Sequence, residues 1–88
     1  MPRYIISRTL DATPTPEEFD AGFIRAKDAL QGLPGVTWVR SYYAEDESKI
    51  YCEYEAPSLE ALIEHARRAH IPFDGAVVVR EFLPGMFQ

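Results

Sequence analysis

The chain has 88 residues and a mass of 10.0 kDa, with nine basic and fourteen acidic side chains and a formal net charge of -5. This length predicts a single domain over residues 1–88, and the composition, 47% hydrophobic and 12% aromatic, is typical of a folded chain. Scattered basic residues predict no nucleic-acid partner, short apolar runs predict no membrane insertion, and the single Cys52 without a signal peptide favours a cytoplasmic protein.

The first half of the chain predicts a strand, a helix and a second strand. The β-branched and aromatic stretch Arg3–Thr9 is a strand sequence, and a proline-rich turn closes it. Thr15 and Glu18 flank a proline at capping-box spacing, so we expect a helix over Pro16–Gln31 that ends at the following glycine. Val36–Tyr43 then predicts the second strand.

The second half predicts a hairpin, another helix and a last strand. Lys49–Glu55 reads as a strand that pairs with the preceding one across the acidic turn Glu45–Glu47. Ser58 is a suitable cap for a helix that ends near His70, and a Val-rich strand follows over Ala76–Leu83. The order βαββαβ predicts an α+β ferredoxin-like fold: a four-stranded antiparallel sheet with both helices on one face, the other face serving dimerisation.

Strand alternation assigns side chains to the two sheet faces. The set expected beneath the helices is small and mostly apolar: Ile5, Ser7, Val39, Ser41, Ile50, Cys52, Tyr54, Val77 and Val79. The set expected on the open face mixes large aromatics with both charge signs: Tyr4, Ile6, Arg8, Trp38, Arg40, Tyr42, Tyr51, Glu53, Glu55, Val78, Arg80 and Phe82. Packing this face against a second copy would bury the rings and pair the arginines with the glutamates, so we expect a homodimer or higher homo-oligomer.

Three side chains are candidate metal ligands, and each also has a structural interpretation. Cys52 is a potential nucleophile or thiolate ligand, but its alternation favours a small core residue beneath the helices. His65 lies at the edge of the apolar stripe of its helix, where it could bind a metal or bridge to a carboxylate. His70 is five residues further on, not the i, i+4 spacing of zinc helices, and capping the helix is a sufficient role.

The carboxylate pair Glu53 and Glu55 is the remaining candidate for chemistry. Both lie on one strand face, where mutual repulsion would raise the pKa of one and poise it as a base. The arginines expected on the same face favour neutralisation instead. No nucleotide-binding glycine motif, hydrolase nucleophile motif or HExxH motif occurs in the sequence.

A family resemblance rests on residues of the hairpin and the second helix. The stretches 38–42 (WVRSY), 51–57 (YCEYEAP) and 60–69 (EALIEHARRA), with Pro72 after them, resemble a family of small bacterial proteins of unknown function, some of whose members are described as nickel-binding. The resemblance implies a ferredoxin-like fold, self-association through the sheet, and binding of nickel or another divalent ion. It implies His65, His70 and Cys52 as ligands, completed from a second subunit.

Three functions follow as alternatives. The first is a small cytosolic protein that binds a divalent metal, with nickel as the ion that the resemblance suggests. The second is an enzyme of the dimeric α+β barrel kind, or a small-molecule-binding protein, that acts without a cofactor. The third is a structural or interaction module. A buried cavity of ligand size would favour the second function, and a binding role is favoured over an enzymatic one throughout.

Overall fold

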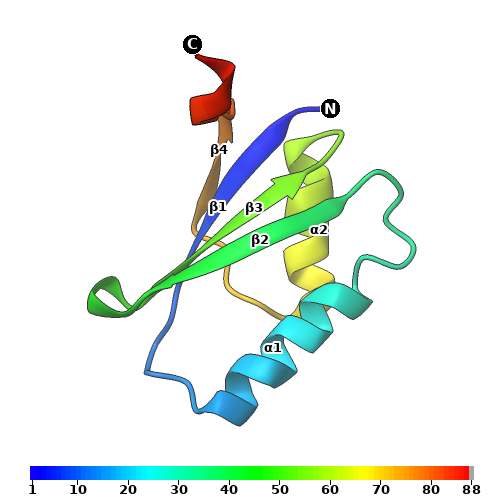
Figure 1. Ribbon diagram of the computed structural model, residues 1–88. Coiled ribbons are helices and arrows are strands. Elements are labelled where there is room, and N and C mark those ends of the chain that lie inside the picture. The colour runs from blue at the N-terminus through cyan, green and yellow to red at the C-terminus, as the bar shows by residue number, and fades with distance from the viewer. Residues whose placement is uncertain (88) are drawn as a thin grey trace.

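The computed structural model describes residues 1–87, which form a four-stranded antiparallel sheet with two helices on one of its faces (Figure 1). The sheet order is β2-β3-β1-β4, so β1 and β3 lie side by side in the middle and β2 and β4 form the two edges. This is the ferredoxin-like α+β arrangement predicted from the element order. The elements are β1 Arg3–Thr9, α1 Pro16–Asp28, β2 Thr37–Ala44, η1 Glu45–Glu47, β3 Lys49–Glu55, α2 Leu59–Ala69, β4 Gly75–Val79 and η2 Pro84–Met86.

Helix α1 begins at the predicted capping box. The Thr15 side chain accepts a hydrogen bond from the Glu18 backbone N–H at 3.1 Å, and the Glu18 side chain accepts one from the Thr15 N–H at 2.8 Å. The helix ends at Asp28 rather than at Gln31, because the next backbone bonds join residues three apart, as in a 3-10 turn. The cap thus fixes where the helix enters the fold.

Helix α2 is capped by a side chain at one end and by a left-handed residue at the other. Ser58 accepts a hydrogen bond from the Ala61 N–H at 3.2 Å, as expected for its cap position. His70 closes the helix with φ 54°, and its backbone N–H reaches back to the carbonyls of Ala66 and Arg67. A non-glycine residue in this conformation is uncommon. His70 thus occupies the C-cap position predicted for it, and its bonds to the helix come from the backbone N–H.

The assignment of β1 to the two faces was wrong. Tyr4 pairs with Tyr54 and Ile6 with Cys52, and residues directly opposite each other in an antiparallel sheet share a face. The side chains of Tyr4, Ile6 and Arg8 therefore lie beneath the helices, at 8%, 0% and 3% exposure. Two adjacent isoleucines at positions 5 and 6 left the hydrophobic alternation of this strand ambiguous, so the sequence pattern did not fix its register.

Trp38 was also placed on the wrong face, and a β-bulge is the reason. The β2–β3 register shifts between Trp38 and Arg40, so alternation along β2 is interrupted there. Trp38 pairs with Tyr54 and lies on the helix side, whereas Arg40 pairs with Glu53 on the open side. The placements of Arg40 and Tyr42 beyond the bulge are correct.

The last strand is shorter than predicted. β4 ends at Val79, so Arg80 and Phe82 lie outside the sheet rather than on its open face. The Arg80 guanidinium carbon lies 5.2 Å from the centre of the Phe82 ring. The segment that follows β4 extends away from the body of the domain (Figure 1), and its apolar side chains Phe82, Leu83, Met86 and Phe87 are 51–64% exposed.

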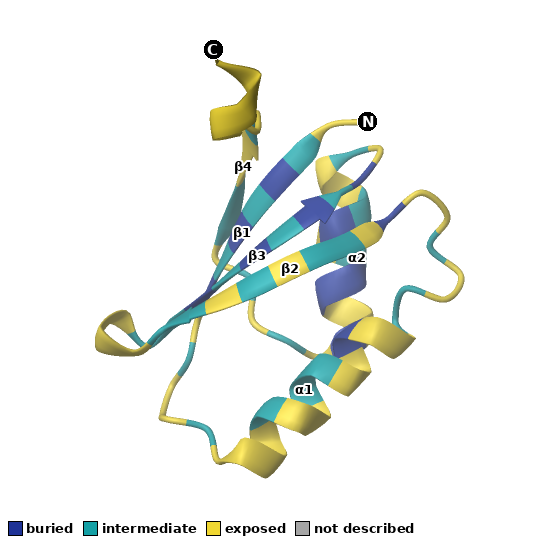
Figure 2. Cartoon of the chain, in the orientation of Figure 1, coloured by how far each residue is buried: buried dark blue, intermediate teal, exposed yellow. Residues whose placement is uncertain are grey.

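The core lies between the sheet and α2 (Figure 2). Its largest fully buried side chains are Tyr54, Ile6, Leu62 and His65. Cys52 is 3% exposed, which confirms its predicted place beneath the helices. No helix in the described part of the chain is long and apolar enough to cross a membrane.

Candidate ligand-binding site

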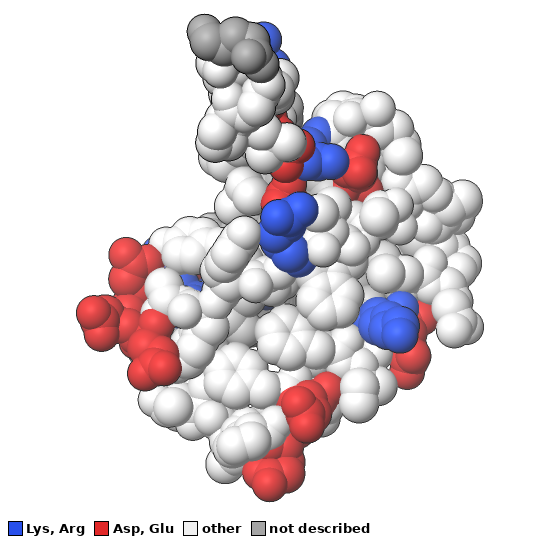
Figure 3. Space-filling view, in the orientation of Figure 1, with Lys and Arg blue, Asp and Glu red and all other residues white. Residues whose placement is uncertain are grey.

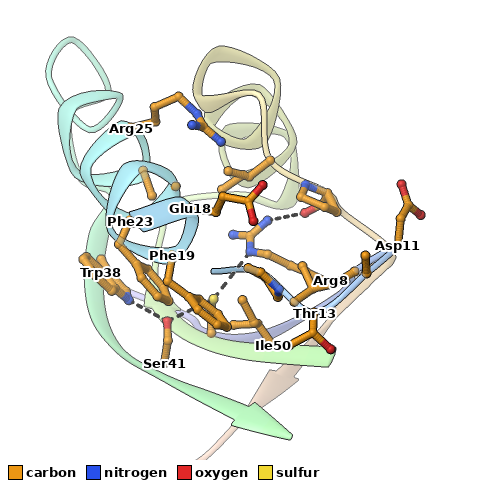
Figure 4. Close-up of a pocket in the computed structure, with 18 of the residues that line it drawn as sticks. Arg8, Asp11, Thr13, Glu18, Phe19, Phe23, Arg25, Trp38, Ser41 and Ile50 are labelled. Atoms are coloured by element: carbon orange, nitrogen blue, oxygen red, sulfur yellow. Dashed lines mark hydrogen bonds between the residues drawn. The ribbon is translucent and has the colours of Figure 1, made fainter. Parts of the chain in front are cut away.

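A cavity of about 350 Å³ lies between α1 and the helix side of the sheet. Its floor comes from the three strands β1, β2 and β3, one wall from α1, and its rim from residues 10–14 and 71–72. Figure 4 shows the lining, with Phe19, Phe23 and Trp38 on one side of Arg8 and Asp11 and Thr13 on the other. The volume falls in the range of small-molecule sites in proteins, about 300–1,000 Å³.

Arg8 is a buried cation whose guanidinium is only partly satisfied. Nε lies 3.4 Å from Cys52 Sγ, and Nη1 donates to the Pro72 carbonyl at 2.7 Å. Nη2 is buried and has no hydrogen-bond partner within residues 1–87. None of the ion pairs among the described residues involves Arg8. A buried charge without a counter-ion is costly, so this nitrogen is a place where a ligand would gain free energy.

A chain of hydrogen bonds runs across the cavity floor to Cys52. The Trp38 indole N–H donates to Ser41 Oγ at 2.9 Å, and Ser41 Oγ donates to Cys52 Sγ at 3.0 Å. With Arg8 on the other side, the sulfur accepts from two donors. This network fixes the orientation of the indole and the guanidinium relative to each other.

The cavity wall on the α1 side is aromatic. The Phe23 ring is stacked on the Trp38 ring at 5.6 Å between centroids and 5° between planes. Phe19 lies 6.1 Å from Phe23 at 10°, and Tyr43 meets Phe19 edge-on at 4.9 Å. Phe19 and Phe23 are one turn apart on α1, so the apolar stripe of this helix faces the cavity.

Tyr54 lies at the bottom of the cavity, next to Arg8. It is 1% exposed, and the guanidinium carbon of Arg8 lies 6.0 Å from the ring centroid. Burial raises the pKa of Tyr54 to about 12, because the phenolate would be desolvated, while the Arg8 charge acts in the opposite direction. The Tyr54 phenol is therefore neutral at physiological pH.

The charged side chains at the rim are of both signs. Asp11 and Glu18 contribute carboxylates, and Arg25 contributes a guanidinium whose Nε donates to the Ala69 carbonyl at 2.9 Å. Glu18 is held in place by the capping box. The buried Arg8 is thus the one cation beneath a rim whose charges are mixed.

His65 ties the two helices together rather than lining the cavity. It is fully buried, not at the core boundary as predicted, and Nε2 lies 2.7 Å from the Ala26 carbonyl oxygen of α1. Because a carbonyl only accepts, Nε2 carries the proton and Nδ1 is the bare nitrogen, which has no partner in the described chain. Burial, more than the nearby charge of Arg8, lowers the pKa of His65.

The three candidate metal ligands do not form a site within one chain. Cys52 contacts Arg8, His65 contacts α1, and His70 is an exposed cap. Among residues 1–87 there is no group of three or more His, Cys, Asp or Glu side chains that could hold a metal ion. A fixed guanidinium against the only thiol also opposes a cation there. The donor set of a single chain does not fit nickel.

The predicted ligand face is divided between the two sides of the sheet. Of the predicted residues, Tyr4, Arg8 and Trp38 share the helix side with Cys52, and Arg8 and Trp38 line the cavity with it. Five of the predicted residues share the open side: Arg40, Tyr42, Tyr51, Glu53 and Glu55. There Glu53 pairs with Arg40 at 3.3 Å and with Arg3 at 3.0 Å, so Arg3 takes the role predicted for Arg8 and Arg80.

Sequence reasoning missed the rim of the cavity and placed Arg8, the donor at its floor, on the opposite face of the sheet. The rim residues 10–14 and 71–72 lie in turns, for which the sequence gives no orientation. The useful signal was Arg8 itself. It follows Tyr4 and Ile6 at two-residue spacing, so an arginine continues the buried side of a strand, where unpaired charge is rare.

Comparison with known proteins finds one matching family model and a similar solved structure. The model of the family described as nickel-responsive protein SCO4226-like matches residues 4–79. The crystal structure of SCO4226 from Streptomyces coelicolor A3(2) is similar with a TM-score of 0.79 and 17% sequence identity, over 92% of this chain and 99% of that one. A search of curated proteins finds no match. At 17% sequence identity, this structural likeness supports the assignment of the fold alone.

Proposed function

The chain belongs to the family of SCO4226-like nickel-responsive proteins, and we propose that it binds a small organic molecule in the cavity between α1 and the sheet. The single observation that carries this function is the buried Nη2 of Arg8, which has no partner within the described residues and lies at a cavity of about 350 Å³. Leaving a buried charged donor unsatisfied costs more than about 1 kcal/mol. A ligand that accepts from Nη2 recovers that free energy.

A cavity-filling variant at Gly22 tests the proposal. Gly22 lines the cavity from α1, and a Cβ there would meet nothing nearer than Arg25 Nη2 at 3.8 Å. Gly22→Leu therefore fills the cavity, and replacing a glycine inside a helix favours folding by about 1 kcal/mol. The matched control is Ala21→Leu, at an exposed position of the same helix.

The measurement is ligand-observed NMR with a set of neutral and anionic aromatic and aliphatic compounds. Compounds that bind the wild-type protein should bind Ala21→Leu equally well and lose binding to Gly22→Leu, while thermal unfolding shows all three proteins folded. Two results contradict the proposal: no compound binds the wild type, or every binder is retained by Gly22→Leu.

Nickel binding is a second candidate function, favoured by the family match. Because the described residues of one chain offer no group of three ligands, the ion would have to be shared between two copies. His70 is the exposed histidine, whereas His65 is fully buried with Nε2 occupied. Calorimetric titration with Ni²⁺ should therefore give heat that His70→Ala removes and His65→Gln retains. Absence of heat, or heat that His70→Ala leaves unchanged, contradicts this candidate.

A further inference from the structure

The orientation of Arg8 selects the head group of a cavity ligand. Its bonds to Cys52 and to the Pro72 carbonyl hold the guanidinium plane, and both hydrogens of Nη2 remain available at a side chain that is 3% exposed. A neutral carbonyl would satisfy a hydrogen bond and leave the charge unpaired. A carboxylate satisfies both, because its planar oxygens match the guanidinium and carry the opposite charge.

The aromatic wall selects the body of the ligand. The rings of Phe23 and Trp38 are stacked at 5° between planes and those of Phe19 and Phe23 at 10°, and all three line the cavity as an apolar aromatic wall. Flat aromatic groups stack or pack edge-on against such surfaces. At about 30 Å³ per water-sized group, a cavity of about 350 Å³ accommodates about a dozen non-hydrogen atoms.

The rim limits the ligand to one negative charge. Asp11 and Glu18 line the opening, and the capping box holds the Glu18 carboxylate in place through the Thr15 N–H at 2.8 Å. Arg25, the rim cation, already donates Nε to the Ala69 carbonyl. A ligand anchored on Arg8 would bring a second anionic group toward these two carboxylates, where like charges repel.

Resting on the proposed function, we infer that the ligand is a small aromatic monocarboxylate, with its carboxylate on Arg8 and its ring against Phe19, Phe23 and Trp38. The head group, the body and the single charge come from three different parts of the cavity: the floor, the α1 wall and the rim. The predicted ligand class is therefore narrower than the proposed function requires.

The test compares trans-cinnamate with cinnamamide, which have nearly the same shape and differ in charge. Isothermal titration of the wild-type protein should give at least about tenfold tighter binding for the acid, the size expected for one charge-assisted contact. Arg8→Met should remove this preference, and Arg8→Lys, which keeps the charge, should retain part of it. Hexanoate tests the aromatic body, and 4-carboxycinnamate tests the limit of one charge; both should bind more weakly than cinnamate.

The possible results distinguish failure of this inference from failure of the proposed function, small-molecule binding in the cavity. Equal binding of cinnamate and cinnamamide to the wild type, with both lost in Gly22→Leu, overturns the inference and leaves cavity binding intact. Hexanoate binding as tightly as cinnamate overturns the aromatic part, and 4-carboxycinnamate binding as tightly overturns the limit to one charge. If neither cinnamate nor cinnamamide binds, the inference fails, and the wider compound set decides the proposed function separately. The acid and amide comparison uses the wild-type protein, so it holds even where a variant fails to fold.

Discussion

Arg8 and His65 are two buried polar residues, and each keeps one nitrogen without a partner among residues 1–87. The charge of Arg8 adds to the effect of burial in lowering the pKa of His65. Arg8 faces the cavity, whereas His65 joins α2 to α1 through the Ala26 carbonyl. The first residue therefore belongs to the candidate ligand site and the second to the packing that holds α1 over it.

The buried histidine predicts a loss of stability in mild acid. Because its pKa is lowered by folding, the unfolded state binds the proton more readily, and the free energy of unfolding falls as the pH drops below the unfolded pKa of about 6.5. The loss continues until the folded pKa is passed, and nothing is lost above about pH 7.5. The charged Arg8 and the titratable Tyr54 are the groups near the ring, and the pKa of Tyr54, raised to about 12 by burial, lies outside this window.

Thermal unfolding of wild type and His65→Gln between about pH 7.5 and about pH 5.5 measures this effect. Glutamine keeps a neutral donor for the Ala26 carbonyl and does not titrate, so the variant should have a flatter pH dependence. His70→Gln is the control and should follow the wild type. A wild-type midpoint that stays constant across the range contradicts the assignment.

At the scale of elements, α1 forms one wall of the cavity, and the position of the helix depends on its first turn. The capping box at Thr15 and Glu18 satisfies two backbone N–H groups that would otherwise lack partners. The sequence predicted this element well because a cap is a local pattern. The bulge in β2 was not predicted, because no residue type marks it, and it decides that Trp38 faces α1.

Removing the Thr15 cap should destabilise α1, the helix that covers the cavity. Thr15→Ala should lower the free energy of unfolding by about 1 kcal/mol, as cap substitutions generally do. Ligand binding in the cavity should weaken along with it, because α1 supplies the aromatic wall. Urea unfolding measures the stability, with Thr37→Ala, an exposed threonine at the start of β2, as the control expected to stay within about 0.5 kcal/mol. Equal losses in both variants would show that the cap is not the cause.

At the scale of the whole molecule, no helix within residues 1–87 covers the open sheet face, because both long helices lie on the other face (Figure 1). The acidic hairpin tip Glu45–Glu47 projects at one side of the domain (Figure 3). The charges of the open face already pair among themselves, with Arg3 bound to Glu53, Glu55 and Glu81 at 3.0–3.3 Å. Tyr42 on β2 and Val77 on β4, the two edge strands, are 59% and 60% exposed on this face. We propose that this face packs against a second copy, because covering it buries apolar surface without leaving an unpaired charge.

Sedimentation velocity tests the dimer directly. The wild-type protein should sediment as about twice the 10.0 kDa chain, and Tyr42→Glu should sediment as a monomer, because it buries an unpaired carboxylate in the interface. Ile63→Glu, at a 47% exposed position on α2, is the matched control and should remain a dimer. A monomeric wild type, or dissociation by both substitutions, would refute the proposed interface.

Most of the fold could be predicted from the chain, because its signals are local. The cap at Thr15, the cap at Ser58 and the β-branched strands fix the element order, and the element order determines the ferredoxin-like topology. The burial of Cys52 followed from the alternation of β3, where the charged residues Lys49, Glu53 and Glu55 share one face and Ile50, Cys52 and Tyr54 share the other.

The candidate site was decided only by the tertiary structure. Which face Arg8 joins depends on the pairing of Ile6 with Cys52, and the two adjacent isoleucines of β1 fit either register. Which face Trp38 joins depends on a bulge that one extra backbone residue creates. The sequence by itself determined a small acidic α+β domain with few metal ligands. Long-range strand pairing determined that its arginine, tryptophan and cysteine meet in one cavity, because face assignment is a property of two strands rather than one.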